Sequence, residues 1–185
     1  SDGPSEAEIG GTMETTLSYW ADEAHAQGGF AINPHFPMPN GEQAALIATG
    51  RLDGIEMIRQ TAFNHEEYYR YLNCGYRLPL VGGTDKMSSD VPVGIYRTYV
   101  QIPDDEPFTY ANWCKYMAAG RTFHSGGPLI RFSVDGHSVG DTVQLPGNGG
   151  TVEVEAVAES VWPLTGLELI CNGELYTRIV IYRIQ

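Results

Sequence analysis

Residues 28–37 read GGFAINPHFP, in which a double glycine precedes a short apolar run and a histidine between two prolines. Apolar residues recur at helical spacing over 12–27, which predicts a helix that ends at Gly28. Pro34 stops the apolar run that follows, so 30–33 is typical of a short buried strand. A helix followed directly by a buried strand is the repeating unit of an α/β fold.

The same alternation continues along the chain from this segment. Short apolar runs bounded by glycine or proline predict further strands, and amphipathic stretches predict helices between them. The expected strands are 54–58, 78–81 and 97–102, and the expected helices are 42–49, one that begins at Asn64, and 109–119. Alternating strands and helices imply right-handed crossovers and a parallel sheet or barrel, with the chemistry just past the carboxyl ends of the strands.

The periodicity changes near residue 126. From there apolar and polar residues alternate with period two, as in 151–158, and Asn172-Gly173 is a strong signal for a two-residue hairpin. Short strands separated by turns predict a small antiparallel β-sandwich. We therefore expect two domains, an α/β part at 1–126 and a truncated, β-rich, sandwich-like part at 127–185.

The two ends of the chain also shape this expectation. The chain begins on a predicted helix and ends on the apolar run 179–185, without a final turn or polar tail. An unpaired apolar strand invites pairing with another chain. We therefore expect either a fragment whose missing N-terminal half completes the α/β part, or a chain that completes itself as a homo-oligomer.

Composition excludes several classes of protein. The chain carries 11 basic and 23 acidic residues, a net charge of −12, which argues against a nucleic-acid partner. No stretch approaches the roughly 18 apolar residues of a membrane helix, so we expect no membrane span. Cys74, Cys114 and Cys171 fit neither a disulfide framework nor a thiolate zinc site. Residues 1–8 do not resemble a signal peptide, so any export signal lies outside this chain and the compartment stays open.

Three residues at predicted strand ends are candidates for a functional site. His35 lies in a loop that two prolines hold rigid, which suits a metal ligand; the alternative is a histidine that hydrogen-bonds a loop carbonyl. Asp85 follows the strand 78–81 in a glycine turn, where it could bind a cation or simply cap the turn. Lys86 could hold an anionic group of a substrate or be an ordinary surface lysine.

Other polar residues carry weaker signals. Glu56 points to the opposite face from Ile55, as either a supporting carboxylate or one member of a structural pair. His25 is expected to offset the dipole at the end of its helix. The chain contains no His-x-His, His-Glu-x-x-His or Gly-x-Ser-x-Gly motif, which argues against a self-contained histidine zinc site and against a serine hydrolase.

Several segments, taken together, resemble one family. They are residues 20–37, 52–57, 82–87, 120–123 with 127–129, and 167–169 with 172–174. In order and spacing they are similar to CehA/McbA-type metallohydrolases of the PHP (polymerase and histidinol phosphatase) superfamily, over the C-terminal part of the barrel and the β-rich domain that follows it.

The resemblance implies a partial, distorted βα barrel with a multinuclear site for divalent zinc, manganese or iron at the strand ends. His35 matches the histidine of the family's His-Pro type motif, and Asp85 matches the aspartate of its late Asp-x-His motif. Here the second residue after Asp85 is Met87, whose thioether is a poor ligand for zinc or manganese. The family's early His-x-His is absent, so we expect this chain alone to lack a complete site.

The function that the resemblance implies is metal-dependent hydrolysis. We expect the C-terminal part of an enzyme that cleaves a small-molecule ester, carbamate or phosphoester with metal-activated water. His35 and Asp85 would be metal ligands and Lys86 a substrate contact. The alternative is a non-catalytic protein whose β-rich part binds a saccharide or another protein. Export of the protein is suggested by family analogy alone.

Overall fold

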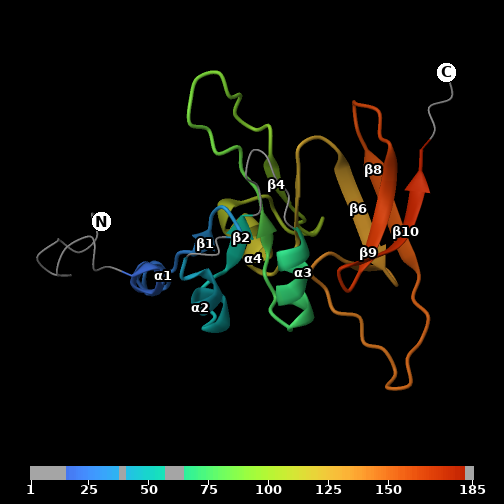
Figure 1. Ribbon diagram of the computed structural model, residues 1–185, viewed down its shortest axis with the longest axis horizontal. Helices are drawn as coiled ribbons and strands as arrows, with labels where there is room; N and C mark the ends of the chain where they lie inside the picture. The colour runs from blue at the N-terminus through green and yellow to red at the C-terminus, as the bar shows by residue number, and fades with distance from the viewer. Residues whose placement is uncertain (1–15, 38–40, 57–64, 182–185) are drawn as a thin grey trace, which may run out of the picture.

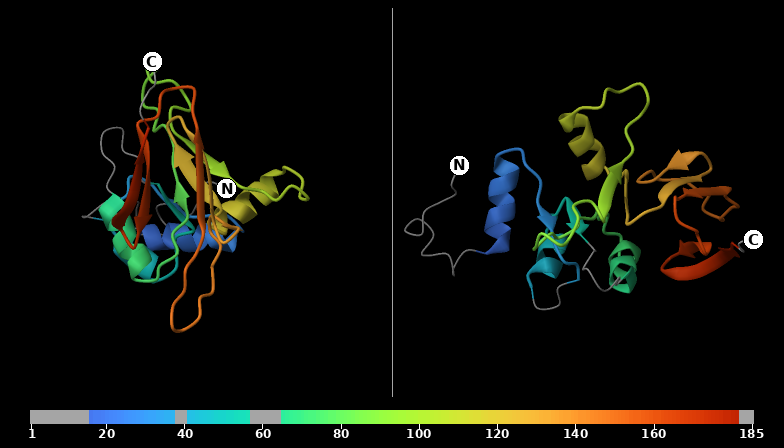
Figure 2. Two further views of the ribbon diagram at one scale, coloured as in Figure 1. Left: turned by 90° about the vertical axis from the view of Figure 1, so that its right-hand side faces the viewer. Right: turned by 90° about the horizontal axis from the view of Figure 1, so that it is seen from above.

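The computed structural model describes residues 16–37, 41–56 and 65–181 of the chain. Helix α1 lies at one end of the molecule and the hairpin of β9 and β10 at the other, with the remaining elements between them (Figure 1). A view from above shows the same order (Figure 2). The start of the helix expected at Asn64, part of the strand expected at 54–58 and the two ends of the chain lie outside the described residues.

Four helices are described: α1 (Leu17–Ala26), α2 (Gln43–Ala48), α3 (His65–Asn73) and α4 (Tyr110–Ala118). Two of them begin at a threonine whose hydroxyl accepts a hydrogen bond from a backbone N–H of the first turn. Thr16 accepts from Tyr19 at the start of α1, and Thr109 accepts from Asn112 at the start of α4. Gly28, after α1, has a φ of +73°, as expected for a glycine that ends a helix.

Three short strands form a parallel sheet in the order β1-β2-β3. They are β1 (Ile32–Asn33), β2 (Gly54–Glu56) and β3 (Leu80–Val81). The main hydrophobic cluster packs around this sheet and consists of Phe36, Ile47, Ile55 and Leu78. Ile55 on the central strand is fully buried. The carboxyl ends of the three strands therefore lie next to the main hydrophobic cluster.

The barrel expected from the resemblance is wrong: no closed barrel exists within the described ranges. The strand after β3, β4 (Arg97–Val100), pairs antiparallel with β5 (Thr122–Ser125), so the parallel run stops at three strands. The physical reason lies in the connection 82–96, which contains no helix. Without a crossover helix, β4 is not obliged to continue the parallel order, and a closed barrel requires every strand to be paired on both sides.

The β-rich part consists of two antiparallel sheets. One has the order β7-β6-β8, from β6 (Leu129–Val134), β7 (His137–Ser138) and β8 (Val154–Glu159), and the other is the hairpin of β9 (Gly166–Cys171) and β10 (Glu174–Val180). The predicted hairpin turn is confirmed, with Asn172 and Gly173 both at positive φ.

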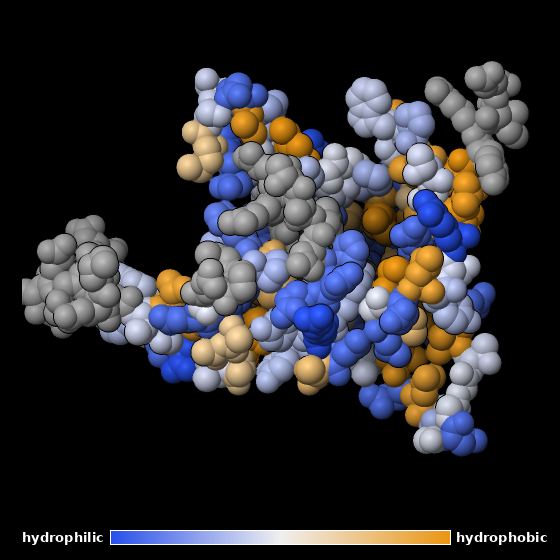
Figure 3. Space-filling model, in the orientation of Figure 1, coloured by the Kyte–Doolittle hydropathy of each residue, from blue (hydrophilic) through white to orange (hydrophobic). Residues whose placement is uncertain are grey.

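The sandwich-like packing of the β-rich part is not observed. Residues 126–181 are all described, and none of them is buried, so the two sheets enclose no core. Apolar side chains instead gather on the surface over β8, β9 and β10 (Figure 3). Trp162, Tyr176 and Ile179 are exposed by 74%, 75% and 62%. Period-two patterning thus produced paired strands without producing two sheets packed face to face.

Within the described ranges, no helix combines the length and the apolar character that a membrane span requires.

Candidate metal-binding site

His35 and Asp85 meet at the carboxyl end of the parallel sheet. His35 follows β1 and Asp85 follows β3, the two strands that flank β2. The Nε2 atom of His35 lies 3.4 Å from Oδ2 of Asp85, although the residues are 50 positions apart in the sequence. Each side chain is about one-third exposed, so a small ligand can reach both. The sequence-based placement of these two candidates at one sheet edge agrees with this geometry.

The backbone of both residues is in the left-handed region. His35 has a φ of +57° and Asp85 a φ of +47°. A residue with a Cβ atom pays for this conformation with roughly 1–2 kcal/mol. Asp and His adopt this region several-fold more often than most residues, and Asp135 and Asn172 adopt it in turns of the β-rich part. Both members of the pair still sit in backbone conformations that need support from neighbouring contacts.

The support for His35 comes from β2 and from the core. Its backbone N–H donates to Oε2 of Glu56 at 3.2 Å, and the next N–H, that of Phe36, donates to the carbonyl of Glu56 at 2.7 Å. The Phe36 side chain is 2% exposed and belongs to the core cluster. The loop that carries His35 is therefore hydrogen-bonded to Glu56 of β2 and packed into the core through Phe36.

The support for Asp85 comes from its own loop. The hydroxyl of Thr84 accepts a hydrogen bond from the N–H of Gly94 at 2.9 Å and joins the two arms of the loop. The ammonium of Lys86 donates to the carbonyls of Ser88 at 2.6 Å and Val91 at 2.5 Å. The structure therefore gives Lys86 a role inside the loop that presents Asp85, and its contact with a substrate stays a prediction.

Glu56 links the histidine loop to the aspartate loop. Its Oε2 atom accepts from His35, and its Oε1 atom lies 3.2 Å from the position that a Cβ would take on Gly83, two residues before Asp85. Glycine at position 83 therefore leaves room for this carboxylate. Of the two readings open from the sequence, the structure favours a carboxylate that supports the site.

A small pocket adjoins the pair. Its volume is about 350 Å³, and Pro34, Glu56, Gly83, Thr98 and Trp113 are among its lining residues. Neither His35 nor Asp85 lines it, so Glu56 is the connection between the pocket and the pair. This volume lies near the lower end of the range for small-molecule sites.

The donor set fits a divalent metal ion in type and spacing. Imidazole nitrogen and carboxylate oxygen are common ligands of zinc, and two ligand atoms about 2.1 Å from a tetrahedral ion are about 3.4 Å apart. The observed Nε2–Oδ2 distance of 3.4 Å matches that spacing and exceeds an ordinary N–H···O hydrogen bond. In the described part of the chain, however, no cluster of three or more histidine, cysteine or acidic residues could hold a metal. Met87, which stands where the family's Asp-x-His motif has its histidine, is 82% exposed.

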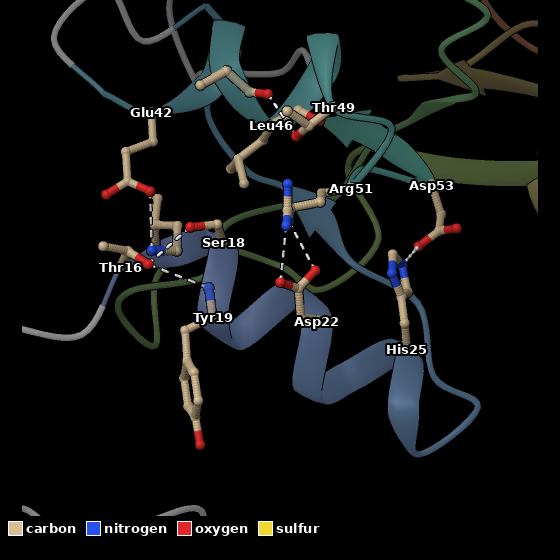
Figure 4. A network of polar contacts seen from close by, with 12 residues as sticks. Thr16, Ser18, Tyr19, Asp22, His25, Glu42, Leu46, Thr49, Arg51 and Asp53 are labelled. Atoms are coloured by element: carbon tan, nitrogen blue, oxygen red, sulfur yellow. Dashed lines mark hydrogen bonds and ion pairs between the residues drawn. The ribbon is translucent and has the colours of Figure 1, made fainter. Parts of the chain in front are cut away.

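His25, expected only to offset a helix dipole, has a specific partner. Its Nε2 atom lies 2.7 Å from Oδ2 of Asp53, and the same oxygen accepts the N–H of Ala31 at 2.7 Å. Figure 4 shows this pair beside a second one, Arg51 with Asp22. Hydrogen bonding to Arg51 lowers the pKa of the Asp22 carboxyl. Both pairs tie α1 to the segment before β2, a contact between distant residues that the sequence did not reveal.

No protein-family model, no curated protein and no solved structure matches the chain. A functional assignment therefore depends on the geometry of the site and on the resemblance described above.

Proposed function

We propose that this chain supplies two ligands, His35 and Asp85, to a divalent metal site of a hydrolase that cleaves a small ester, carbamate or phosphoester. The observation that carries the proposal is the meeting of these side chains 3.4 Å apart at one sheet edge, both with left-handed backbone. Neither conformation is favourable for a residue with a side chain. A purely structural ion pair between groups that are one-third exposed would contribute little to offset that cost.

Each residue of the site has a distinct part in this proposal. His35 and Asp85 bind the ion, and Glu56 positions the histidine through its backbone N–H. Lys86 and Thr84 hold the loop that carries Asp85. A bound divalent ion would polarise the scissile carbonyl or phosphoryl group and acidify a water molecule. The pocket of about 350 Å³ beside Glu56 offers space for a small substrate group.

The resemblance to CehA/McbA-type metallohydrolases supports the same two ligands. The three-stranded parallel sheet gives no support to that resemblance beyond the placement of the ligands at strand ends. Because two protein ligands are fewer than a catalytic zinc site uses, further ligands would have to come from outside the pair.

Cobalt binding tests the metal site directly, because tetrahedral Co²⁺ absorbs visible light far more strongly than hydrated Co²⁺. We expect the chain to develop this absorption on titration and His35→Ala and Asp85→Asn to lose it. His137→Ala is the matched control, since the His137 side chain is exposed and, among the described residues, bonds the carbonyl of Asp135 alone. Cobalt spectra that are identical in His35→Ala and the unmodified chain would refute the metal site.

Hydrolysis is a separate measurement. p-Nitrophenyl acetate, a p-nitrophenyl carbamate and bis(p-nitrophenyl) phosphate cover the three ester classes, each tested with zinc, manganese and iron(II). We expect the chain alone to be inactive, because it lacks a complete set of ligands, and a longer protein that includes the expected N-terminal half to show turnover that depends on the metal and disappears in Asp85→Asn. Cobalt binding by that longer protein without turnover of any of the three would retain the metal site and reject the hydrolase.

A second candidate function is favoured by the exposed apolar surface of the β-rich part. Val161 and Trp162, which are adjacent in the sequence, are exposed by 94% and 74%, and Tyr176 on β10 is exposed by 75%. This observation favours a non-catalytic role in which the β-rich part binds a saccharide or a protein. Retained turnover in a Trp162→Ala, Tyr176→Ala variant would separate that role from the proposed hydrolysis.

A further inference from the structure

A second, larger pocket lies away from His35, Glu56 and Asp85. Its volume is about 760 Å³, within the usual range of small-molecule sites. It is lined by parts of α3, β3, β5 and β6, the end of α4 and the turn after β7, and it contains no residue of the candidate metal site. The chain thus has a concave site that the proposed hydrolysis does not use.

Most of the wall is apolar. Leu72, Leu80, Phe123, Phe132 and Val139 contribute aliphatic and aromatic side chains from five different segments. These residues are only partly buried or exposed, so the wall remains accessible. An apolar wall of this kind favours a ligand with a hydrocarbon or aromatic portion.

The polar groups in the wall are mostly uncharged. Burial lowers the pKa of His124, which favours its neutral form, and raises the pKa of Tyr68 to about 12, which keeps its hydroxyl protonated. The one carboxylate in the lining belongs to Asp141, and it already accepts from Arg121 and from the N–H of Ser138, each at 3.0 Å. No free negative charge of a lining side chain therefore opposes an anionic ligand there.

Thr122 places a buried hydroxyl in the same wall. The residue is 8% exposed, and within the described ranges its Oγ1 atom has no hydrogen-bond partner. A buried hydroxyl without a partner is unfavourable by roughly 1–3 kcal/mol on protein-based scales. A polar ligand atom in the pocket could supply that partner after a small shift of the side chain.

Arg77 brings a positive charge to the pocket. Its guanidinium donates to Oγ1 of Thr142 at 2.5 Å, and within the part of the chain that the structure describes it forms no ion pair with a carboxylate. Five other arginines do pair with a carboxylate: Arg51, Arg70, Arg121, Arg131 and Arg178. Arg97 and Lys86 likewise bond no carboxylate among the described residues, but of the three cations only Arg77 lines this pocket.

From these observations we propose that the pocket binds a small amphipathic monocarboxylate. The carboxylate pairs with the guanidinium of Arg77, whose planar fork matches the two oxygens. The hydrocarbon portion lies against Phe123, Phe132 and Val139, and Thr122 donates its hydroxyl to the polar end. This site is independent of the proposed hydrolase function, because it shares no residue with it.

Octanoate is a suitable probe. Octanol, which has the same hydrocarbon chain without the charge, and propionate, which has the charge with a short chain, are the comparison ligands. Titration calorimetry measures the affinities, and amide chemical shifts locate the site. We expect octanoate to bind at least about tenfold more tightly than either partner, because charge-assisted pairing and apolar burial each contribute. Shift changes should centre on the lining residues of β5, β6 and α3.

Substitutions of Arg77 and Thr122 test whether these residues contact the octanoate. Arg77→Gln should weaken octanoate by about tenfold or more, whereas Arg70→Gln, which alters an arginine of the same region already paired with Glu67, should leave it unchanged. Thr122→Val keeps the shape and should weaken binding by a smaller factor. Circular dichroism confirms that each variant is folded, and Arg77→Lys, expected to retain part of the affinity, replaces Arg77→Gln if that variant does not fold.

Four outcomes would overturn the proposal. Three of them are the absence of octanoate binding, equal affinities for octanoate and octanol, and shift changes confined to the exposed surface of β9 and β10. An affinity that Arg77→Gln and Arg70→Gln change equally would also overturn it, because the carboxylate would then not be held by Arg77.

Discussion

The α/β part and the β-rich part differ in what their paired strands enclose. Around the parallel sheet, Phe36, Ile47, Ile55 and Leu78 form a buried cluster, and Tyr68 and Tyr71 of α3 pack against it. From residue 126 to residue 181 the strands are just as well paired, yet no residue there is buried. Backbone pairing and turn chemistry can therefore form sheets without a core, whereas packing requires a second layer over the sheet.

The contrast also explains where the candidate sites lie. His35 and Asp85 lie in the loops that follow β1 and β3, and the loop of His35 is fixed to the buried cluster through Phe36. The pocket near Arg77 lies where the two parts of the chain meet, a common position for ligand sites. The sheets of the β-rich part carry exposed apolar side chains instead.

The largest expected effect comes from making the same substitution, isoleucine to alanine, in each of the two parts and comparing the loss of stability. Ile55→Ala removes a fully buried side chain and should lower the free energy of unfolding by about 2–5 kcal/mol, because it leaves a cavity. Ile179→Ala, at 62% exposed, should change it by about 0.5 kcal/mol or less. Urea unfolding followed by circular dichroism measures both. Equal losses would show that β10 is buried in the protein in solution.

The second prediction concerns the hairpin turn between β9 and β10, which lies against α3 of the α/β part. Gly173 has a φ of +85°, and a Cβ there would lie 3.0 Å from Cβ of Tyr69 on α3. Gly173→Ala should therefore destabilise the hairpin by about 1–2 kcal/mol, as seen in faster amide hydrogen exchange in β9 and β10. Gly147→Ala is the control, because Gly147 has open space around its Cβ position and no positive φ. Unchanged hydrogen exchange in Gly173→Ala would mean that the turn accommodates a Cβ atom at this position without loss of stability.

A third, smaller effect is expected inside the α/β part. His25→Ala removes the 2.7 Å contact with Asp53 that ties α1 to the segment before β2, and should cost about 1 kcal/mol. A double-mutant cycle with Asp53→Asn isolates the pair, because Asp53 also accepts the N–H of Ala31. Additive losses in the cycle would show that His25 acts without Asp53, for instance through the helix dipole.

The smallest effect is a pH dependence at the boundary between the two parts. Burial lowers the pKa of His124 on β5, so the unfolded chain, with a pKa of about 6.5, binds a proton more readily than the folded one. Stability should therefore fall as the pH drops from about 6.5 toward the folded pKa and should be restored as it rises again. His124→Gln should show a shallower loss over that interval than the unmodified protein. Parallel pH profiles of the two proteins would exclude this contribution.

Much of the local structure could be predicted from the sequence. The helices that end at Gly28 and Gly120, the strands around residues 32, 55 and 80, and the Asn172-Gly173 hairpin follow from signals a few residues long. The placement of His35 and Asp85 at one sheet edge also follows, because the carboxyl ends of parallel strands point the same way.

Other features depended on contacts between distant residues. The barrel was a wrong expectation because a strand's neighbours are chosen among all strands, and β4 paired with β5 instead of extending the parallel sheet. The sandwich core was expected from alternation, yet alternation marks only which face could be buried and not whether another layer covers it. The pairing of His25 with Asp53 joins residues 28 positions apart without any local pattern.

The sequence by itself determined most of the helices, strands and turns, because those depend on backbone preferences and short-range spacing. It also placed His35 and Asp85 after the strands β1 and β3, while their role as metal ligands is a proposal. Tertiary structure alone decided the strand order beyond β3, the open sheets of the β-rich part and the supporting contacts of Glu56 with His35. Those outcomes are set by long-range packing, in which each segment's partner is selected from the whole chain.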